Sequence, residues 1–285
     1  MRVRITHTTH YHYDRSVQLS PHWIRLCPAN DVINGTDRYA LTIQPDSHQL
    51  FWLLDAGGNR VARALFPESI NALLLEVTME KEINPSNPFN FLVDPAAQHF
   101  PWSYSPNQQV LLSPYRTVSP DTPLLNNWPN NLPRPDDGND TITFITDLNQ
   151  ALADAITYHE RIRPGVRNPS DTLTRSAGSC RDSAWLLVNL LRRAKLAARF
   201  VSGYLLHLEK QRPDKDKVDL HAWVEVYLPG PGWIGLDATS GLLTAQNHIP
   251  LARGAVPMTT SPVEGSTEPC HSELSHESRL ERITA

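Results

Sequence analysis

The sequence has little cysteine and no long hydrophobic run. Its three cysteines, Cys27, Cys180 and Cys270, are odd in number and far apart along 285 residues. That count argues against a disulfide framework and predicts free thiols in a reducing compartment. The longest apolar stretch, residues 184–191, is interrupted by Asn189 and is far too short to cross a bilayer. We therefore expect neither disulfide cross-links nor a membrane-spanning segment.

No secretion signal is expected from the sequence, and neither sign of charge dominates. Residues 1–13 alternate polar and apolar side chains, so no signal peptide is predicted and a cytoplasmic location is expected. Lysine and arginine number 26 against 30 acidic residues, and the net charge is -4. No basic field marks a nucleic-acid partner, and no membrane partner is expected. With 40% hydrophobic and 20% charged residues, the composition is typical of a soluble globular protein.

Residues 1–112 have the pattern of a β-rich domain. Val3 and Ile5, and then Tyr11 and Tyr13, alternate with polar residues at the period of a half-buried strand. Turn-forming pairs such as Asn34-Gly35 separate further short apolar runs. These runs are residues 23–26, 39–43, 49–54, 73–77, 89–93 and 110–112. Short strands at this spacing predict an antiparallel sandwich or barrel.

A linker and two helices are predicted next. Residues 113–140 are dense in proline, asparagine and aspartate, which is typical of a linker. Apolar side chains then recur at helical spacing over residues 144–156. A second helix is predicted to begin at about Cys180, because Ser179 stands where an N-cap belongs and Asp182 completes a capping box.

Strands follow that helix, and the chain ends in a segment without a pattern. The strands are predicted at residues 198–208, 220–228 and 233–236. Residues 141–243 would then form one core, a helix packed on an antiparallel sheet. Residues 244–285 are rich in proline, serine and glutamate and are predicted to be an irregular C-terminal tail. The expected fold class is α+β, with the β-rich domain first.

Cys180 has the position of a reactive thiol. It lies four residues before Ala184 and therefore on the apolar stripe of its helix, facing whatever that stripe packs against. It also lies in the first helical turn, where unpaired N–H groups and the helix dipole favour an anion such as a thiolate. Arg181 adds positive charge beside it, while Asp182 opposes that effect. A single buried cysteine is usually a small hydrophobe, so the residues near Cys180 decide whether its thiol is reactive.

His221 and Asp237 are suitable partners. His221 opens one predicted strand and Asp237 closes the next, so a hairpin would bring them together at one end of the ladder. The carboxylate would fix the histidine tautomer and stabilise the imidazolium, while the imidazole takes the thiol proton and later protonates a leaving group. Such a triad contains its own nucleophile and base, so neither a cofactor nor a metal ion is expected.

Four motifs in this order resemble the core of the bacterial transglutaminase-like family. They are GSCRD at residues 178–182, FVSGYL at 200–205, HAWVEV at 221–226 and GWIGLDAT at 232–239. The similarity covers residues 142–243, and YHYD at residues 11–14 resembles the β domain that often precedes this core. The resemblance implies a papain-like fold with Cys180 as nucleophile, His221 as base and Asp237 as orienting acid.

The resemblance further implies acyl transfer through a thioester, and we expect a hydrolase that acts on peptide or amide bonds. Two features depart from the family pattern. Ala238 stands where a proline commonly follows the acid, and no side chain is assigned as oxyanion donor beside the backbone N–H of Cys180. Tail residues 248–252 and 261–265 resemble a segment that, in longer relatives, leads to an ATP-grasp-like amide ligase. This implies an ATP-grasp-like ligase partner for a truncated or stand-alone chain.

Three alternatives remain open. An amine could replace water as acyl acceptor, although water needs no second binding site. The chain could be a binding module that kept the fold, although all three triad residues are present. His7, His10 and His12 could hold a metal ion, but ligands at zinc-like spacing are missing nearby, which favours exposed strand histidines.

Three motif residues are candidates for lining a cleft. Trp223 and Glu225 share the His221 face of their strand by its period of two. Tyr204 is the third candidate, although a packing role suits this aromatic residue better.

Overall fold

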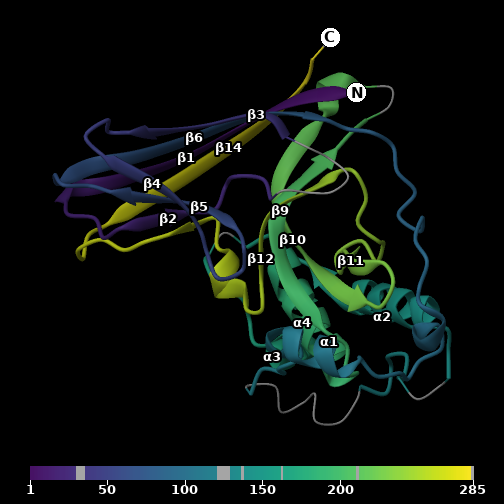
Figure 1. Ribbon diagram of the computed structural model, residues 1–285. Coiled ribbons are helices and arrows are strands. Elements are labelled where there is room, and N and C mark those ends of the chain that lie inside the picture. The colour runs from purple at the N-terminus through teal and green to yellow at the C-terminus, as the bar shows by residue number, and fades with distance from the viewer. Residues whose placement is uncertain (30–35, 121–128, 136–137, 162, 210–211, 284–285) are drawn as a thin grey trace.

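The architecture combines three four-stranded antiparallel sheets with helices gathered at one end (Figure 1). The computed structural model describes residues 1–285 except 30–35, 121–128, 136–137, 162, 210–211 and 284–285. Antiparallel sheets and few helices confirm the predicted α+β class.

Two of the sheets form the β-rich part. Their strand orders are β14-β1-β6-β3 and β13-β2-β5-β4. The strands are β1 Arg2–Val17, β2 His22–Ile24, β3 Thr36–Gln44, β4 Gln49–Leu54, β5 Arg60–Leu65, β6 Ile70–Glu82, β13 Val263–Glu264 and β14 Ser272–Ile283. Alternate side chains of β1, such as Val3 and Ile5, are fully buried in a core shared with β2, β5 and β6. The predicted alternation of the first strand is therefore confirmed.

The third sheet has the order β11-β10-β9-β12 and carries the candidate site. The elements around it are β9 Ala198–His207, β10 Lys217–Leu228, β11 Gly232–Leu236, β12 His248–Gly254, α2 Thr141–Ala155, α3 Pro169–Arg175 and α4 Cys180–Arg193. One face, with Val224 and Val226, shares a core with α2 and α4. Farther along the same strands, Tyr204, Leu206 and Ile249 pack into the core of the β-rich part. The two helices and three strands predicted for this part are confirmed, and the sheet is buried on both sides.

The prediction of an irregular tail at residues 244–285 is wrong. β12 completes the third sheet, while β14 returns to the β-rich part and pairs with β1 from Tyr13↔Ser272 to Arg2↔Ile283. The two ends of the chain consequently lie close together (Figure 1). Most β14 side chains are exposed, so backbone pairing defines this strand, and it lacks the apolar alternation by which a strand is recognised.

The connecting segments also differ from expectation. Residues 89–93 are irregular rather than a strand, and residues 110–112 lie at the end of helix α1 (Pro106–Leu111). Proline at the first helical position and a capping box formed by Ser105 and Gln108 explain that helix. β5 and α3 were not predicted. The linker 113–140 and the Asn34-Gly35 turn lie partly or wholly outside the described residues.

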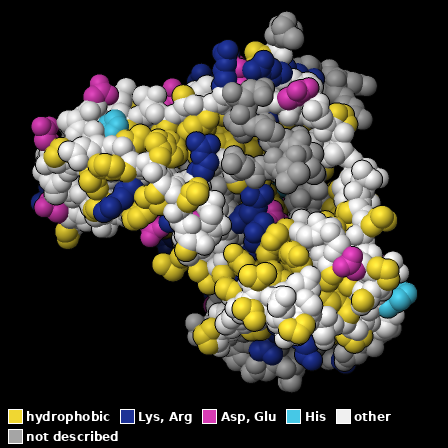
Figure 2. All heavy atoms as spheres, viewed as in Figure 1, with side chains coloured by type: hydrophobic (Ala, Val, Ile, Leu, Met, Phe, Trp, Pro, Cys, Tyr) yellow, Lys and Arg dark blue, Asp and Glu magenta, His cyan; other side chains and the backbone are white. Residues whose placement is uncertain are grey.

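Among the described residues, no helix is both long and apolar enough to cross a membrane. Figure 2 shows acidic and basic side chains interspersed over the visible face, as a net charge of -4 would suggest.

Candidate active site

Cys180 is the first residue of α4, as predicted. Ser179 donates from its backbone N–H and from its hydroxyl to the Asp182 carboxylate, at 2.9 Å each, and so closes the first turn. The Cys180 side chain is partly exposed and packs at the edge of the helix–sheet core. Its sulfur therefore lies at a helix N-terminus, where backbone dipoles favour an anion, and remains accessible from one side.

Asp182 connects the loops that surround Cys180. Its fully buried carboxylate accepts from the Arg161 guanidinium at 2.6 Å and from the Arg167 backbone N–H at 2.7 Å. Burial by itself raises the pKa of Asp182, but these donors and Ser179 outweigh it and lower the pKa. The negative charge of Asp182, which by itself disfavours a thiolate at Cys180, is thus offset by Arg161.

The β10–β11 hairpin brings His221 and Asp237 together. Val224 lies opposite Leu236, so His221 and Asp237 fall at the same end of the ladder. His221 Nε2 lies 3.1 Å from Asp237 Oδ2, and the two side chains are 9% and 3% exposed. The other oxygen, Oδ1, accepts the Thr239 backbone N–H at 2.9 Å. The predicted pairing of these two residues is confirmed as geometry.

The protonation of His221 is coupled to Asp237 and Cys180. Burial lowers the pKa of His221, but hydrogen bonds to Asp237 and Cys180, and the charges on both, outweigh it and raise the pKa to about 10. Burial likewise raises the pKa of Asp237, yet hydrogen bonds from His221 and His248 hold it far below its usual range. Since Nε2 of His221 faces Asp237, Nδ1 is the nitrogen left for the thiol. The raised pKa therefore favours the imidazolium form of His221 at neutral pH.

The contact of His221 with Asp237 is close but poorly aligned. Within the described part of the chain, Nε2 of His221 is buried and meets no acceptor in full hydrogen-bond geometry. Catalytic hydrogen bonds in unliganded sites are often misaligned and tighten when substrate binds. The contact thus fits an unliganded state.

His248 is a further partner of Asp237 that the sequence did not assign. It opens β12, its side chain is 8% exposed, and its Nε2 lies 3.4 Å from the same Oδ2 atom. In the sequence, His248 stood out only as part of the tail segment 248–252. No local pattern indicates that the start of β12 lies beside the end of β11. These strands are at opposite edges of the sheet.

The cluster of His221, Asp237 and His248 has a spacing that metal ions also use. In the described residues it is the one such group of three, with its ligand atoms within 4.8 Å of one another. Hydrogen bonding accounts for it without an ion, because the Ala245 backbone N–H donates to His248 Nδ1 at 3.3 Å. Nε2 of a neutral His248 then carries the proton and has no lone pair to offer a metal. We therefore assign the cluster to hydrogen bonding.

Two family models match this chain. Residues 3–82 match the bacterial transglutaminase-like N-terminal region, and residues 135–238 match the transglutaminase-like superfamily, a segment that contains Cys180, His221 and Asp237. Both matched segments are transglutaminase-like.

Similar proteins extend over nearly the whole transglutaminase-like chain. Uncharacterised proteins of Mycobacterium tuberculosis and Mycobacterium bovis are 27% identical over 278 residues, which cover 93% of this chain and 87% of theirs. The crystal structure of a candidate cysteine protease from Cytophaga hutchinsonii has a TM-score of 0.60 at 17% identity, over 97% of this chain and 90% of that one. That likeness shows a common fold.

Trp223 shields the two histidines of this transglutaminase-like site instead of lining an open cleft. It is 2% exposed, and its ring lies 6.4 Å from that of His221 and 5.2 Å from that of His248, measured between centroids. A glycine on the neighbouring strand permits this packing. A Cβ at Gly203 would collide with the indole and with the carbonyl oxygen of Ile249.

We expect Gly203→Ala to lower the free energy of unfolding by about 1–3 kcal/mol, because the added methyl must displace Trp223 or β12. Urea denaturation followed by tryptophan fluorescence measures the change. An unfolding midpoint equal to that of the wild type would contradict the argument.

Glu225 and Tyr204, the other candidates for a cleft, are also buried, and for Tyr204 this confirms the preferred packing role. Glu225 accepts from Arg199 at 2.6 Å and from Arg253 at 3.1 Å. Burial raises the pKa of Glu225, but the two guanidinium groups outweigh it and lower the pKa. Tyr204 is fully buried in the core of the β-rich part, where its ring packs on His7. The period of two placed Trp223 and Glu225 on one strand face correctly, but side chains of the neighbouring strands β9 and β12 pack around them.

Tyr158 lies beside the nucleophile position and was missed in the sequence. It belongs to β7 (Thr157–Tyr158), which pairs with β8 (Ala177–Gly178) so that Tyr158 lies opposite Gly178, just before Cys180. The side chain is 52% exposed. Burial and then the nearby charge of Cys180 raise the pKa of Tyr158, so its phenol keeps a proton that can be donated at the mouth of the site.

The N-terminal histidines differ from expectation in one respect. His10 and His12 are exposed, as expected, but His7 is buried and hydrogen-bonded to Ser278 Oγ at 2.8 Å and Thr9 Oγ1 at 3.0 Å. Burial lowers the pKa of His7 to about 4, and the charge of His276 adds to this effect. His7 therefore acts as a neutral buried side chain.

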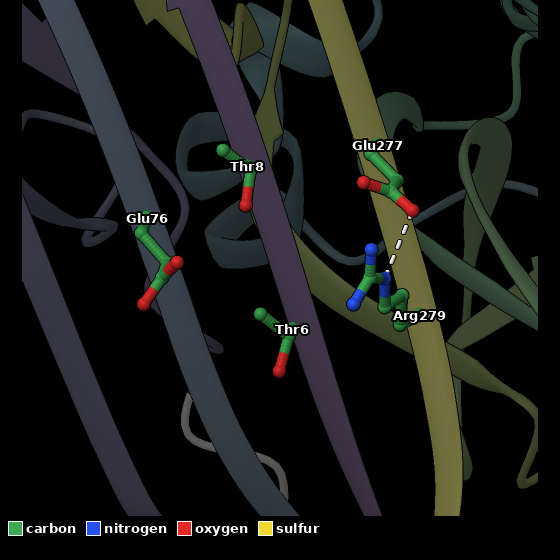
Figure 3. A pocket seen from close by; sticks show the side chains of 5 residues that line it. All are labelled: Thr6, Thr8, Glu76, Glu277 and Arg279. Atoms are coloured by element: carbon green, nitrogen blue, oxygen red, sulfur yellow. Dashed lines mark hydrogen bonds and ion pairs between the residues drawn. The ribbon is translucent and has the colours of Figure 1, made fainter.

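A hollow of about 190 Å³ on the first sheet is separate from Cys180 (Figure 3). Its lining residues are Thr6, Thr8, Glu76, Glu277 and Arg279. Arg279 is paired with Glu277 at 2.8 Å, and the lining contains no thiol or imidazole. It therefore provides no alternative to the site at Cys180.

Proposed function

We propose that this chain is a cysteine hydrolase that cleaves amide or peptide bonds through a thioester on Cys180. One observation carries the proposal: His221 lies between the partly exposed thiol of Cys180 and the buried carboxylate of Asp237. A binding module would not require an imidazole whose pKa is raised by both neighbours.

The reaction follows from this order of groups. The thiolate of Cys180 attacks the substrate carbonyl carbon, and the backbone N–H of Cys180 can stabilise the oxyanion. The imidazolium of His221 gives its proton to the leaving amine, and the C–N bond breaks to leave a thioester. Neutral His221 then takes a proton from water as it attacks the thioester. The carboxylic acid leaves, and Cys180 is again a thiolate beside an imidazolium.

Water is favoured over an amine as acyl acceptor. Near pH 7 a lysine-like amine with a pKa of about 10.4 is only about one part in 2,500 free base, so a transamidase needs a site that binds and desolvates the amine. Glu225 was the candidate for such a site, but it is buried and paired with Arg199 and Arg253. Its charge is thus used within the fold.

The test supplies an acyl donor with rising concentrations of a primary amine, in reducing buffer with a chelator, and measures acid and amide products. We expect the free acid to dominate at millimolar amine, with no product from Cys180→Ala. Asp219 is an exposed carboxylate near the site: its charge, like that of Cys180, raises the pKa of Tyr158. Asp219→Asn therefore tests whether this carboxylate binds the amine. If the amide dominates and Asp219→Asn removes that preference, the enzyme is a transamidase.

A further inference from the structure

Asp237 is held by three contacts, two to its carboxylate and one to its backbone. Thr239 occupies Oδ1 through its backbone N–H at 2.9 Å, and Nε2 of His248 approaches Oδ2 at 3.4 Å. The backbone carbonyl of Asp237 accepts from the Asn149 side chain of α2 at 3.3 Å. With both oxygens engaged, rotation of the carboxylate would break a contact on each. Oδ2 therefore stays directed toward His221.

The tautomer of His248 follows from its other nitrogen. Nδ1 accepts the Ala245 backbone N–H at 3.3 Å, which places the proton of a neutral imidazole on Nε2. Asn247 Oδ1 also lies 3.2 Å from Nδ1. The carboxylate oxygen Oδ2 beside Nε2 can only accept a hydrogen bond, which favours the same tautomer over one with the proton on Nδ1. In this tautomer His248 presents an N–H to Oδ2.

We propose that His248 is a positioning residue that holds Asp237 toward His221, so that the catalytic unit is a chain of four side chains rather than three. The idea rests on the proposed function, because it assigns a role within the same reaction. Among the described residues, the side chain of His248 contacts Asp237, Asn247, the Ala245 backbone N–H and the rings of His221 and Trp223. It acts through Asp237 by supplying a donor to a carboxylate whose side chain is only 3% exposed.

A packing role is the competing explanation, since Trp223 lies edge-on against the His248 ring. Two variants separate the roles. His248→Gln keeps an N–H at a similar reach but cannot ionise, whereas His248→Leu keeps apolar volume against Trp223 and removes the donor. We expect His248→Leu to lower kcat about 10- to 100-fold with KM nearly unchanged, which is the size of one charge-assisted hydrogen bond. His248→Gln should retain most of the wild-type kcat.

A substrate-free measurement distinguishes this idea from the proposed hydrolase activity. The rate at which iodoacetamide alkylates Cys180 is recorded against pH for the wild type and both variants. The groups that face His221 are Cys180 from α4, Asp237 from β11 and His248 from β12. A loosened Asp237 supports the imidazolium less well. The alkaline limb of the His248→Leu profile should therefore move to lower pH, while His248→Gln follows the wild type.

The outcomes are decisive in both directions. Wild-type kcat and an unshifted alkylation profile in His248→Leu would overturn the role of His248, as would damage in His248→Gln equal to that in His248→Leu. If the wild type hydrolyses nothing but the alkylation profiles separate as expected, the proposed function fails and the positioning role stands.

Discussion

Cys180→Ala is expected to lower kcat by more than about 10⁴-fold, the largest effect of any single change in this chain. No other group in the proposed mechanism can form the thioester, and removal of a catalytic nucleophile commonly has effects of this size or greater. The fold should persist, because alanine fits the first turn of α4 and Ser179 and Asp182 still close that turn. Turnover of a peptide or amide panel, with circular dichroism as the control for folding, measures the effect.

The other cysteines serve as internal controls for the same residue. Iodoacetamide at mildly acidic pH should label Cys180 first. Cys27 is 1% exposed, and burial raises the pKa of its thiol, so it should react last. Cys270 is partly exposed and packs against the core of the β-rich part, away from His221. Equal labelling of all three cysteines in the folded protein, mapped by mass spectrometry, would refute a special role for Cys180.

Asp237→Asn is expected to lower kcat by about 10³- to 10⁴-fold without loss of the fold. An amide in this place can select the wrong tautomer of His221 and no longer stabilises its imidazolium. His221→Ala should be at least as severe. Asp219 was the alternative partner for His221, but it is paired with His207 at 3.4 Å and its side chain is 67% exposed. Asp219→Asn is therefore the matched control and should hydrolyse substrate at nearly the wild-type rate.

The pH dependence of this variant has a definite sign. The folded pKa of His221 is raised to about 10, so the imidazolium persists at neutral pH and is lost as the pH rises through that value. The wild-type rate should thus fall only on the far alkaline side, with an apparent pKa that belongs to the coupled pair. Without the Asp237 charge, the raising effect is smaller and the alkaline limb should move toward lower pH. An unmoved limb in Asp237→Asn would mean that another group stabilises the imidazolium.

Local sequence signals predicted the central elements of the site. The capping residues and apolar stripe of α4 place Cys180 at a helix start whatever the helix packs on, because caps and stripes act within a few residues. The turn at residues 229–231 joins two antiparallel neighbours, β10 and β11, so His221 and Asp237 meet by the geometry of a hairpin. Predictions that depended on more distant neighbours were less successful. The location and the ATP-grasp-like partner stay predictions.

The sequence by itself determined the α+β class, the start of α4 and the meeting of His221 with Asp237, because each depends on caps, periods or turns between residues close along the chain. Only the tertiary structure decided that β14 pairs with β1, that Tyr204 and Glu225 are buried, and that His248 reaches Asp237 from the opposite edge of the sheet. The physical reason is that these features depend on backbone pairing and on packing between segments far apart in sequence. An exposed strand such as β14 is defined by its hydrogen-bonded partner, and a residue on a correctly predicted face is buried or open according to what covers that face.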